Sequence, residues 1–201
     1  DQGAHNINLV TATQYLPSIL NALDLVKNQL EIPVVYNSSG YEKPETIRLL
    51  KGYVDIYLPD LKYFSSELSR KYSKAEDYFE IASCAIKLMI EQTGAPVFDS
   101  DGMLQKGVIV RHLVLPNCRK DSISLLHWLK ETLPDKHYLI SLLSQYTPFY
   151  NSHKYPELNR RITTYEYETI LKEAISLGLV EGFMQEKSSA KEEYTPPFDL
   201  E

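Results

Sequence analysis

The chain has 201 residues, of which 43% are hydrophobic and 24% charged, as is ordinary for a globular protein with one sizeable core. Its formal net charge of −6 argues against a nucleic-acid partner, because such proteins usually present a basic face. No apolar run is long enough to cross a membrane, and the polar residues 1–5 show no signal-peptide pattern. These features predict a cytoplasmic protein without a membrane partner.

Short apolar runs rich in β-branched residues recur along the chain and are typical of buried strands. They predict strands over residues 6–11, 32–36, 54–58, 108–114 and 138–143, with a weaker one at 182–185. Amphipathic stretches with apolar residues three and four positions apart lie between them and predict helices over residues 16–30, 79–90, 122–133 and 164–177. Thr163 or Thr164 is a suitable cap for the last helix, and Gly178 suits its end.

Strand–helix alternation of this kind predicts an α/β domain built on a parallel sheet, over residues 1–185. The segment 186–201 carries Lys, Glu, Ser and two adjacent prolines, and we expect it to be an extended or partly disordered tail. Cys84 and Cys118 are too few and too far apart for a metal knuckle or a disulfide framework, so two reduced thiols are the expectation.

Polar residues follow the predicted strands, where parallel α/β folds place their chemistry. Thr11 and Thr13 follow the first strand, Asn37 and Ser38 the second, Asp60 and Lys62 the third, and Tyr146 the fifth, while Arg111 interrupts the fourth. Each hydroxyl could equally be a loop or capping residue. A charge inside a buried strand is unfavourable unless paired, so Arg111 should meet either Asp60 or a ligand carboxylate. Lys62 could bind a ligand anion or merely neutralise Asp60.

Five segments resemble, in the same order, those of radical S-adenosylmethionine (SAM) proteins of the pyruvate formate-lyase-activating type. They are residues 3–11 (GAHNINLVT), 35–42 (VYNSSGYE), 54–63 (VDIYLPDLKY), 110–117 (VRHLVLPN) and 155–162 (YPELNRRI). Each motif alone is weak, but the five together run over nearly the whole chain.

The resemblance implies a partial parallel (β/α)6 TIM-like barrel, here lacking its first strand. It implies that the parent protein binds SAM against a [4Fe-4S] cluster, cleaves it reductively to a 5′-deoxyadenosyl radical, and abstracts hydrogen from a glycine of a partner enzyme or from another substrate. It also implies positions for SAM contacts: Thr11 and Thr13 in the turn for the SAM amino group, and Asn37 and Ser38 either near SAM or at a cation site. Asp60 and Lys62 match an Asp-x-Lys pair, Arg111 matches an arginine near the SAM carboxylate, and Tyr146 stands where the family has a histidine.

The chain departs from the family in one decisive way, because it has no Cys-x3-Cys-x2-Cys segment to hold the cluster. We expect Asp1 to mark a truncation, and we expect the chain alone to be inactive, to hold no [4Fe-4S] cluster and to bind SAM weakly or not at all. The sequence leaves open a non-catalytic remnant that binds a nucleotide or a peptide on the same rim, and an unrelated cytosolic α/β protein.

The possible partner is a glycyl-radical-type or other protein substrate. The missing first strand would also leave residues 7–10 as a bare apolar edge, which invites self-association. Against this, Tyr194 and Phe198 of the tail could fold back and cover that edge.

Overall fold

A computed structural model describes residues 3–184 of the chain. Its secondary structure alternates strands and helices, as the apolar runs predict. The strands are β1 (Ile7–Val10), β2 (Val34–Ser38), β3 (Ile56–Pro59), β4 (Val97–Phe98), β5 (Leu104–Leu113), β6 (Leu139–Leu143) and β7 (Gly182–Met184). The helices are α1 (Leu16–Val26), α2 (Pro44–Leu49), α3 (Ser66–Ser73), α4 (Tyr78–Thr93), α5 (Arg119–Thr132) and α6 (Thr164–Ser176), with short 3-10 turns η1 (Thr13–Tyr15), η2 (Lys27–Gln29) and η3 (Tyr150–Lys154).

The strands form one sheet in the order β1-β2-β3-β5-β6-β7, and every neighbouring pair along this path is parallel. The order follows the chain, and β1 lies at one edge, as expected for the strand nearest the N-terminus. The described strands do not close into a barrel, since β1 and β7 remain separate edges. The fold is therefore an α/β arrangement with an open, mostly parallel sheet.

One strand departs from the parallel sheet that the sequence predicts. β4 pairs antiparallel with β5, and the two strands form a hairpin. β5 begins at Leu104, earlier than the predicted residue 108. The Asp99 carboxylate orders the connecting turn by accepting hydrogen bonds from the backbone N–H groups of Asp101 and Met103, at 3.0 and 2.8 Å. The turn consists of Asp, Ser and Gly and contains no regularly spaced apolar residues. The apolar pattern therefore did not predict the hairpin.

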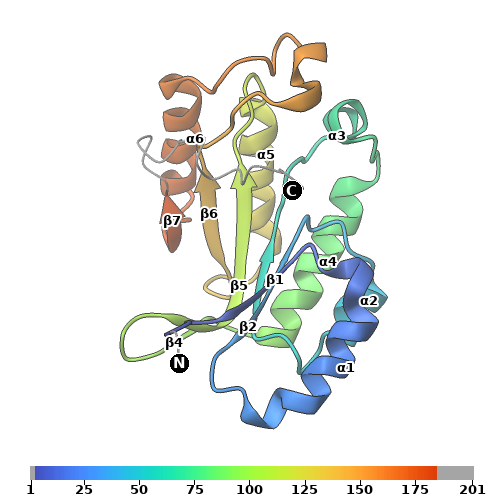
Figure 1. The fold of residues 1–201 in the computed structure, drawn as a ribbon. Coiled ribbons are helices and arrows are strands. Elements are labelled where there is room, and N and C mark those ends of the chain that lie inside the picture. Colours follow the sequence, from blue (N-terminus) through green and yellow to red (C-terminus); the bar gives the residue numbers. More distant parts are fainter. Residues whose placement is uncertain (1–2, 185–201) are drawn as a thin grey trace.

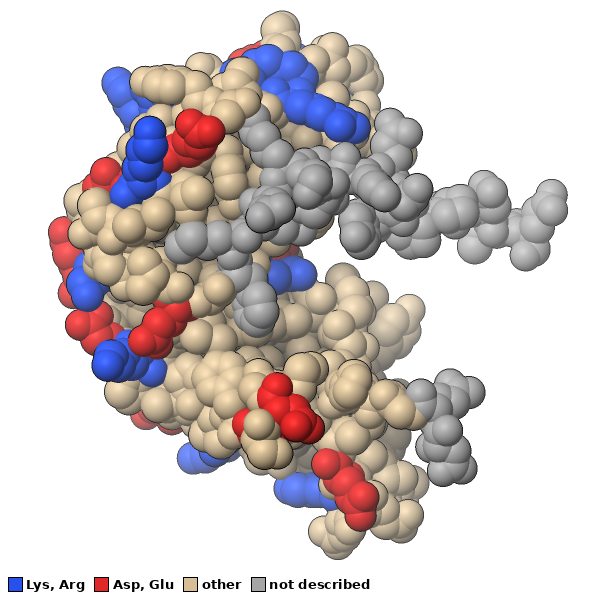
Figure 2. All heavy atoms as spheres, turned by 90° about the vertical axis from the view of Figure 1, so that its left-hand side faces the viewer, with Lys and Arg blue, Asp and Glu red and all other residues tan. Residues whose placement is uncertain are grey.

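The helices pack against one face of the sheet and leave the other face hollow. In Figure 1, α4 and α5 lie behind the sheet, and Figure 2 shows the molecule in profile as an arc around a hollow. The strand residues that face the helices, such as Tyr36, Tyr57 and Val110, are fully buried, whereas those on the opposite face, such as Asn37, Leu58 and Arg111, are only partly buried. We call this second face the concave face.

Two short helices were not predicted, because each offers few apolar positions. Pro44 starts α2 at a position that suits its missing N–H, and the Ser65 hydroxyl caps α3 by accepting from the Glu67 and Leu68 N–H groups. The predicted cap of α6 is confirmed: Thr163 and Glu166 form a capping box. The predicted tail 186–201, with Tyr194 and Phe198, lies outside the described residues.

Candidate functional site

The carboxyl ends of β2, β3 and β5 bring three predicted residues together on the concave face. Asp60 pairs with Arg111 across the sheet just beyond the end of β3, and Ser141 of β6 lies beside Arg111 in register. Asn37 is near the end of β2. Because side chains alternate along a strand, these residues all point to the side away from the helices.

Arg111 is held by two partners at one end of its guanidinium. Its Nη2 lies 2.6 Å from Asp60 Oδ1 and donates to Asn37 Oδ1 at 2.7 Å. The side chains of Arg111 and Asp60 are 27% and 24% exposed, so the pair is shielded but reachable. Arg111 Nε, in contrast, is buried and has no hydrogen-bond partner among the described residues. The sequence left Asp60 and a ligand as alternatives for Arg111, and the fold supplies Asp60.

Lys62, two residues after Asp60 in the chain, completes the cluster. Its Nζ lies 3.5 Å from Asp60 Oδ2, so one carboxylate is shared by two cations. The three side chains together carry one net positive charge. Such a cluster favours a ligand with an anionic group.

A cavity of about 360 Å³ opens beside this cluster. Leu113, Leu115 and Leu143 form an apolar part of its lining, and the cluster forms a charged part. Tyr63 and Gln145 also line it, and sequence reasoning did not select either as a site residue. A mainly apolar cavity with a few converging polar groups is the usual form of a small-molecule site.

Tyr78 was also missed, although it fixes the backbone that carries the cluster. Its buried hydroxyl lies 2.9 Å from the carbonyl oxygens of both Ser39 and Asp60 and accepts a hydrogen bond from the Lys62 N–H at 3.1 Å. Burial raises its pKa above the usual tyrosine range. Tyr78 fits the spacing of the apolar residues of α4, and an aromatic residue at such a position is usually part of the hydrophobic core.

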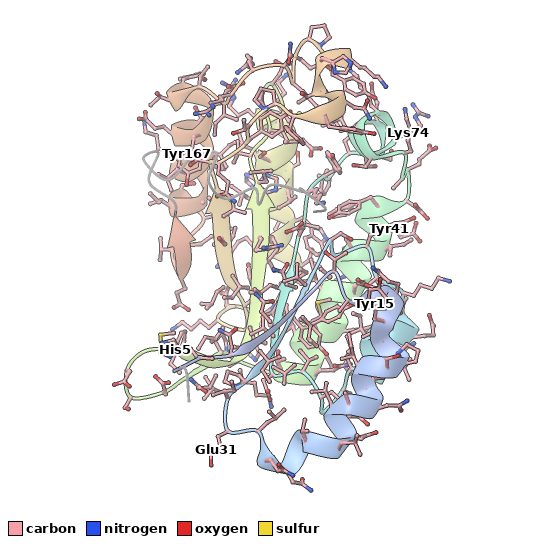
Figure 3. All side chains as sticks on the ribbon, in the orientation of Figure 1. His5, Tyr15, Glu31, Tyr41, Lys74 and Tyr167 are labelled. Atoms are coloured by element: carbon pink, nitrogen blue, oxygen red, sulfur yellow. The ribbon has the colours of Figure 1, made fainter. Side chains whose placement is uncertain are left out.

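Tyr78 also stacks on Tyr41, with ring centroids 5.9 Å apart. Figure 3 shows Tyr41 on the side of the sheet where Tyr15 marks the start of α1 and Lys74 the end of α3. The turn after β2 is thereby packed against the loop that holds the charged cluster.

Two other predicted residues near the first strands lie apart from the charged cluster. Thr11 is exposed beyond β1, and its N–H donates to the Asn37 carbonyl at 2.9 Å. The Thr13 hydroxyl donates to Glu42 at 2.7 Å and lies 2.9 Å from the Tyr36 hydroxyl, among buried residues. Burial raises the pKa of the Glu42 carboxyl. Thr13 is therefore used within the fold.

Ser38 and Tyr146 likewise make contacts within the protein. The buried Ser38 hydroxyl accepts from the Gly40 N–H at 3.2 Å, which shapes the turn after β2. The Tyr146 hydroxyl donates to the Leu158 carbonyl at 2.9 Å. Neither hydroxyl is among the groups that line the cavity.

His112, next to Arg111 in the chain, points toward the helices. Its Nδ1 lies 2.7 Å from the Leu61 carbonyl and its Nε2 2.8 Å from the Ser122 hydroxyl. A carbonyl oxygen can only accept, so Nδ1 carries the proton and Nε2 accepts from Ser122. Burial lowers the pKa of this imidazole, and His112 is a neutral structural residue.

The two thiols are placed where they cannot act together. Cys84 is exposed on α4, whereas Cys118 is buried at the start of α5. Within residues 3–184, no group of three or more His, Cys, Asp or Glu side chains is arranged to hold a metal ion. In the same part of the chain, no helix is long and apolar enough to span a bilayer.

Comparison with known proteins identifies solved structures with a similar fold and a relative with a similar sequence. The fold resembles the crystal structure of a domain of pyruvate-formate lyase-activating enzyme from Bacteroides vulgatus, with a TM-score of 0.62 and 14% sequence identity, over 90% of this chain and 98% of that one. At this identity, the likeness shows the fold alone.

The sequence is 34% identical over 172 residues to the uncharacterized protein MJ0674 of Methanocaldococcus jannaschii. The match includes 83% of this chain but only 45% of the relative, so the chain spans about half the length of that protein. No family model matches the sequence. What these comparisons show is an α/β fold shared with a domain of an activating enzyme.

Proposed function

We propose that this chain is a fragment of a radical SAM protein of the pyruvate formate-lyase-activating type, and that its concave face carries the SAM side of the site. The observation that carries the proposal is the Asp60–Arg111–Lys62 cluster beside the cavity at the carboxyl ends of the strands. The fold likeness to the activating-enzyme domain and the five resembling segments support it.

The side chains around the cavity fit the amino-acid part of SAM. Arg111 has an unpartnered Nε for a carboxylate oxygen, Lys62 adds a second cation, and Asp60 is an acceptor for an ammonium group. Leu113 and Leu143 offer apolar contact to the rest of the ligand. In the family that this chain resembles, bound SAM is the source of the radical that abstracts hydrogen from the substrate.

The residues do not fit the iron–sulfur cluster of that family. A [4Fe-4S] cluster needs thiolates grouped closely together, whereas Cys84 lies exposed on one helix and Cys118 lies buried at the start of another. We therefore assign no step through a cluster to this chain. We propose that the ligands of the iron–sulfur cluster lie outside this chain. The chain by itself would then bind a ligand on the concave face without catalytic activity.

The mismatch also favours a second candidate, a binding module that uses the same rim for a nucleotide or a peptide without catalysis. The observation behind it is that described residues of this chain form both the cavity and its charged cluster. The two candidates share the cavity and differ in the ligand that binds it.

The test is binding of SAM to the chain by saturation-transfer NMR. We expect a dissociation constant on the order of millimolar, because the charged rim acts without the metal that anchors SAM in the family. Arg111→Gln should abolish the signal, since it removes the unpartnered donor and leaves Asp60 paired with Lys62.

The matched control is Arg119→Gln, which changes the net charge equally at a residue that stacks on Tyr165, outside the cavity. Absence of SAM binding at 10 mM, about ten times that dissociation constant, or binding that survives Arg111→Gln, would contradict the proposal. Binding of ATP or a peptide in place of SAM, with the same dependence on Arg111, would favour the second candidate.

A further inference from the structure

The segment between β6 and α6, residues 144–163, crosses the carboxyl end of the sheet with only the short turn η3 in it. We call it the strap. Figure 1 shows it in orange above the ends of β5 and β6, reaching toward α3. Gln145, near its start, lines the cavity, so the strap begins at the candidate site.

The strap is fixed firmly where it meets α6. The Arg160 guanidinium makes two hydrogen bonds to the Glu166 carboxylate, at 2.7 and 2.8 Å, and the same carboxylate accepts from the backbone N–H groups of Asn117 and Thr163. Glu166 is buried, and its hydrogen bonds, that with Arg160 foremost, hold its pKa well below the usual range. Opening this anchor would separate the buried Glu166 carboxylate from Arg160 and from two backbone N–H groups together, which is costly, so we expect it to stay closed.

The strap is held to α3 by a second, more exposed set of contacts among Lys71, Tyr72, Tyr155 and Glu157, which we call the clasp. Glu157 Oε1 accepts from Lys71 Nζ at 2.6 Å and from the Tyr72 hydroxyl at 2.9 Å. The Tyr155 hydroxyl donates to the Lys71 carbonyl at 2.8 Å, and the Tyr72 and Tyr155 rings meet edge to face at 5.1 Å.

The two attachments differ in how easily they open. The side chains of Lys71 and Glu157 are 47% and 23% exposed, and an ion pair in contact with water is weak and screened by salt. The anchor at Glu166 is buried and has more hydrogen bonds. The strap should therefore detach at the clasp while its attachment to α6 holds.

The clasp is linked to the lining of the cavity through Tyr63, whose ring lies 6.4 Å from that of Tyr72. On the α3 side, Tyr63 lines the cavity and its hydroxyl lies 3.0 Å from that of Ser73, the last residue of α3. On the other side, Gln145 belongs to the strap. Separating α3 from the strap would widen the entrance.

We propose that the strap is a gate over the cavity, opened by release of the Lys71–Glu157 clasp. The inference rests on the proposed function in one respect, that the cavity is the ligand site.

The chain contains its own reporter for this motion. Cys118 is buried, and Glu157, Lys71 and Tyr72 of the clasp are among the groups that affect the pKa of its thiol. Burial, followed by the nearby carboxylates of Asp121 and Glu157, raises the pKa of this thiol to about 11. Cys84 is exposed on α4 and can be removed by Cys84→Ser.

The experiment measures the rate at which Ellman's reagent labels Cys118 in the Cys84→Ser background. Glu157→Gln should raise this rate by about two- to fivefold, the factor expected for loss of one exposed ion pair. Raising sodium chloride to about 1 M should accelerate labelling in the parent protein but much less in the variant, because the charge pair is screened at that ionic strength.

The matched control is Glu76→Gln, which removes an exposed partner of Arg70 beyond the end of α3 without touching the strap. Equal rates for Glu157→Gln and the parent, or an equal acceleration in Glu76→Gln, would overturn the gate. Glu157→Gln also removes a carboxylate that raises the pKa of the Cys118 thiol, which by itself favours labelling. Tyr155→Phe removes one clasp hydrogen bond without changing a charge, so it should also accelerate labelling, and an unchanged rate in this variant would overturn the gate.

Addition of SAM separates this inference from the proposed function. Slower labelling with SAM bound would support both. Clasp-dependent labelling that SAM leaves unchanged would support the gate and count against SAM as the ligand of the cavity.

Discussion

At the scale of single residues, the position of Asp60 depends on a close approach between two backbone segments that only a residue without a side chain permits. Gly40 adopts a φ of +76°, and a Cβ placed there would lie 2.1 Å from the Asp60 carbonyl oxygen. The Tyr78 hydroxyl donates to the same carbonyl at 2.9 Å. Asp60 is therefore positioned by a glycine and a tyrosine that do not line the cavity.

Gly40→Ala should lower the free energy of unfolding by about 3 kcal/mol, since it combines a left-handed backbone with a clash against the chain that carries Asp60. Gly178→Ala is the matched control, with a φ of +74° and open space around the added Cβ, and should lose only about 1 kcal/mol. Urea unfolding measures both. Equal losses would mean that the close approach to Asp60 carries no strain.

At the scale of elements, one histidine joins three of them. His112 of β5 is hydrogen-bonded to Leu61 in the loop after β3 and to Ser122 of α5. Burial lowers its pKa, so the folded protein keeps it neutral at a pH where the unfolded chain binds a proton. The pairing of strand and helix should therefore weaken in mild acid.

The direction of this pH dependence follows from proton binding. Below the ordinary histidine pKa of 6.5, the unfolded state holds one more proton, so the free energy of unfolding should fall by up to about 1.4 kcal/mol per pH unit. At pH values above the ordinary histidine pKa, the contribution of His112 to the free energy of unfolding is fully present.

Urea unfolding between pH 7 and 5 checks this expectation. His112→Asn should reduce the dependence of the free energy of unfolding on pH by up to one proton. His153 is exposed, and His153→Asn should leave this dependence unchanged. A slope unchanged by His112→Asn would contradict the neutral assignment.

At the scale of the whole molecule, the sheet ends on an edge strand that lacks the usual protection. Within the described part of the chain, β1 pairs only with β2, and residues 6–11 contain neither a charge nor a proline. Val10 is 61% exposed on this strand. Such an edge can pair with another chain.

We expect the chain to self-associate in solution as a twofold dimer through β1. Light scattering over a concentration series should show a dimer at high concentration, and Val10→Lys should shift the equilibrium to the monomer by placing a charge on the edge. Val180→Lys is the matched control, because Val180 is 56% exposed elsewhere. A monomer at every concentration would refute the expectation.

Most of the architecture could be read from the sequence. Buried parallel strands need near-continuous apolar runs, and helices packed on one face need apolar residues three and four apart, so both patterns appear in the chain itself. The strand-end positions of Asp60 and Lys62 and the charge of Arg111 in a buried strand predicted one shared rim, with Asp60 or a ligand as the partner of Arg111; the contact of Arg111 with Asn37 was not predicted. What escaped prediction were short elements such as α2, α3 and β4, which offer too few apolar positions for a period.

Tertiary structure alone decided which polar residues reach the cavity. Arg111 and His112 are adjacent polar residues in one buried strand, and only the placement of the helices sends the first to the concave face and the second to Ser122. Thr13 also follows a strand, yet its hydroxyl is used by Glu42. The clasp joins Lys71 to Glu157, 86 positions apart, and no local pattern encodes such a contact, because it forms only when the folded sheet brings α3 and the strap together.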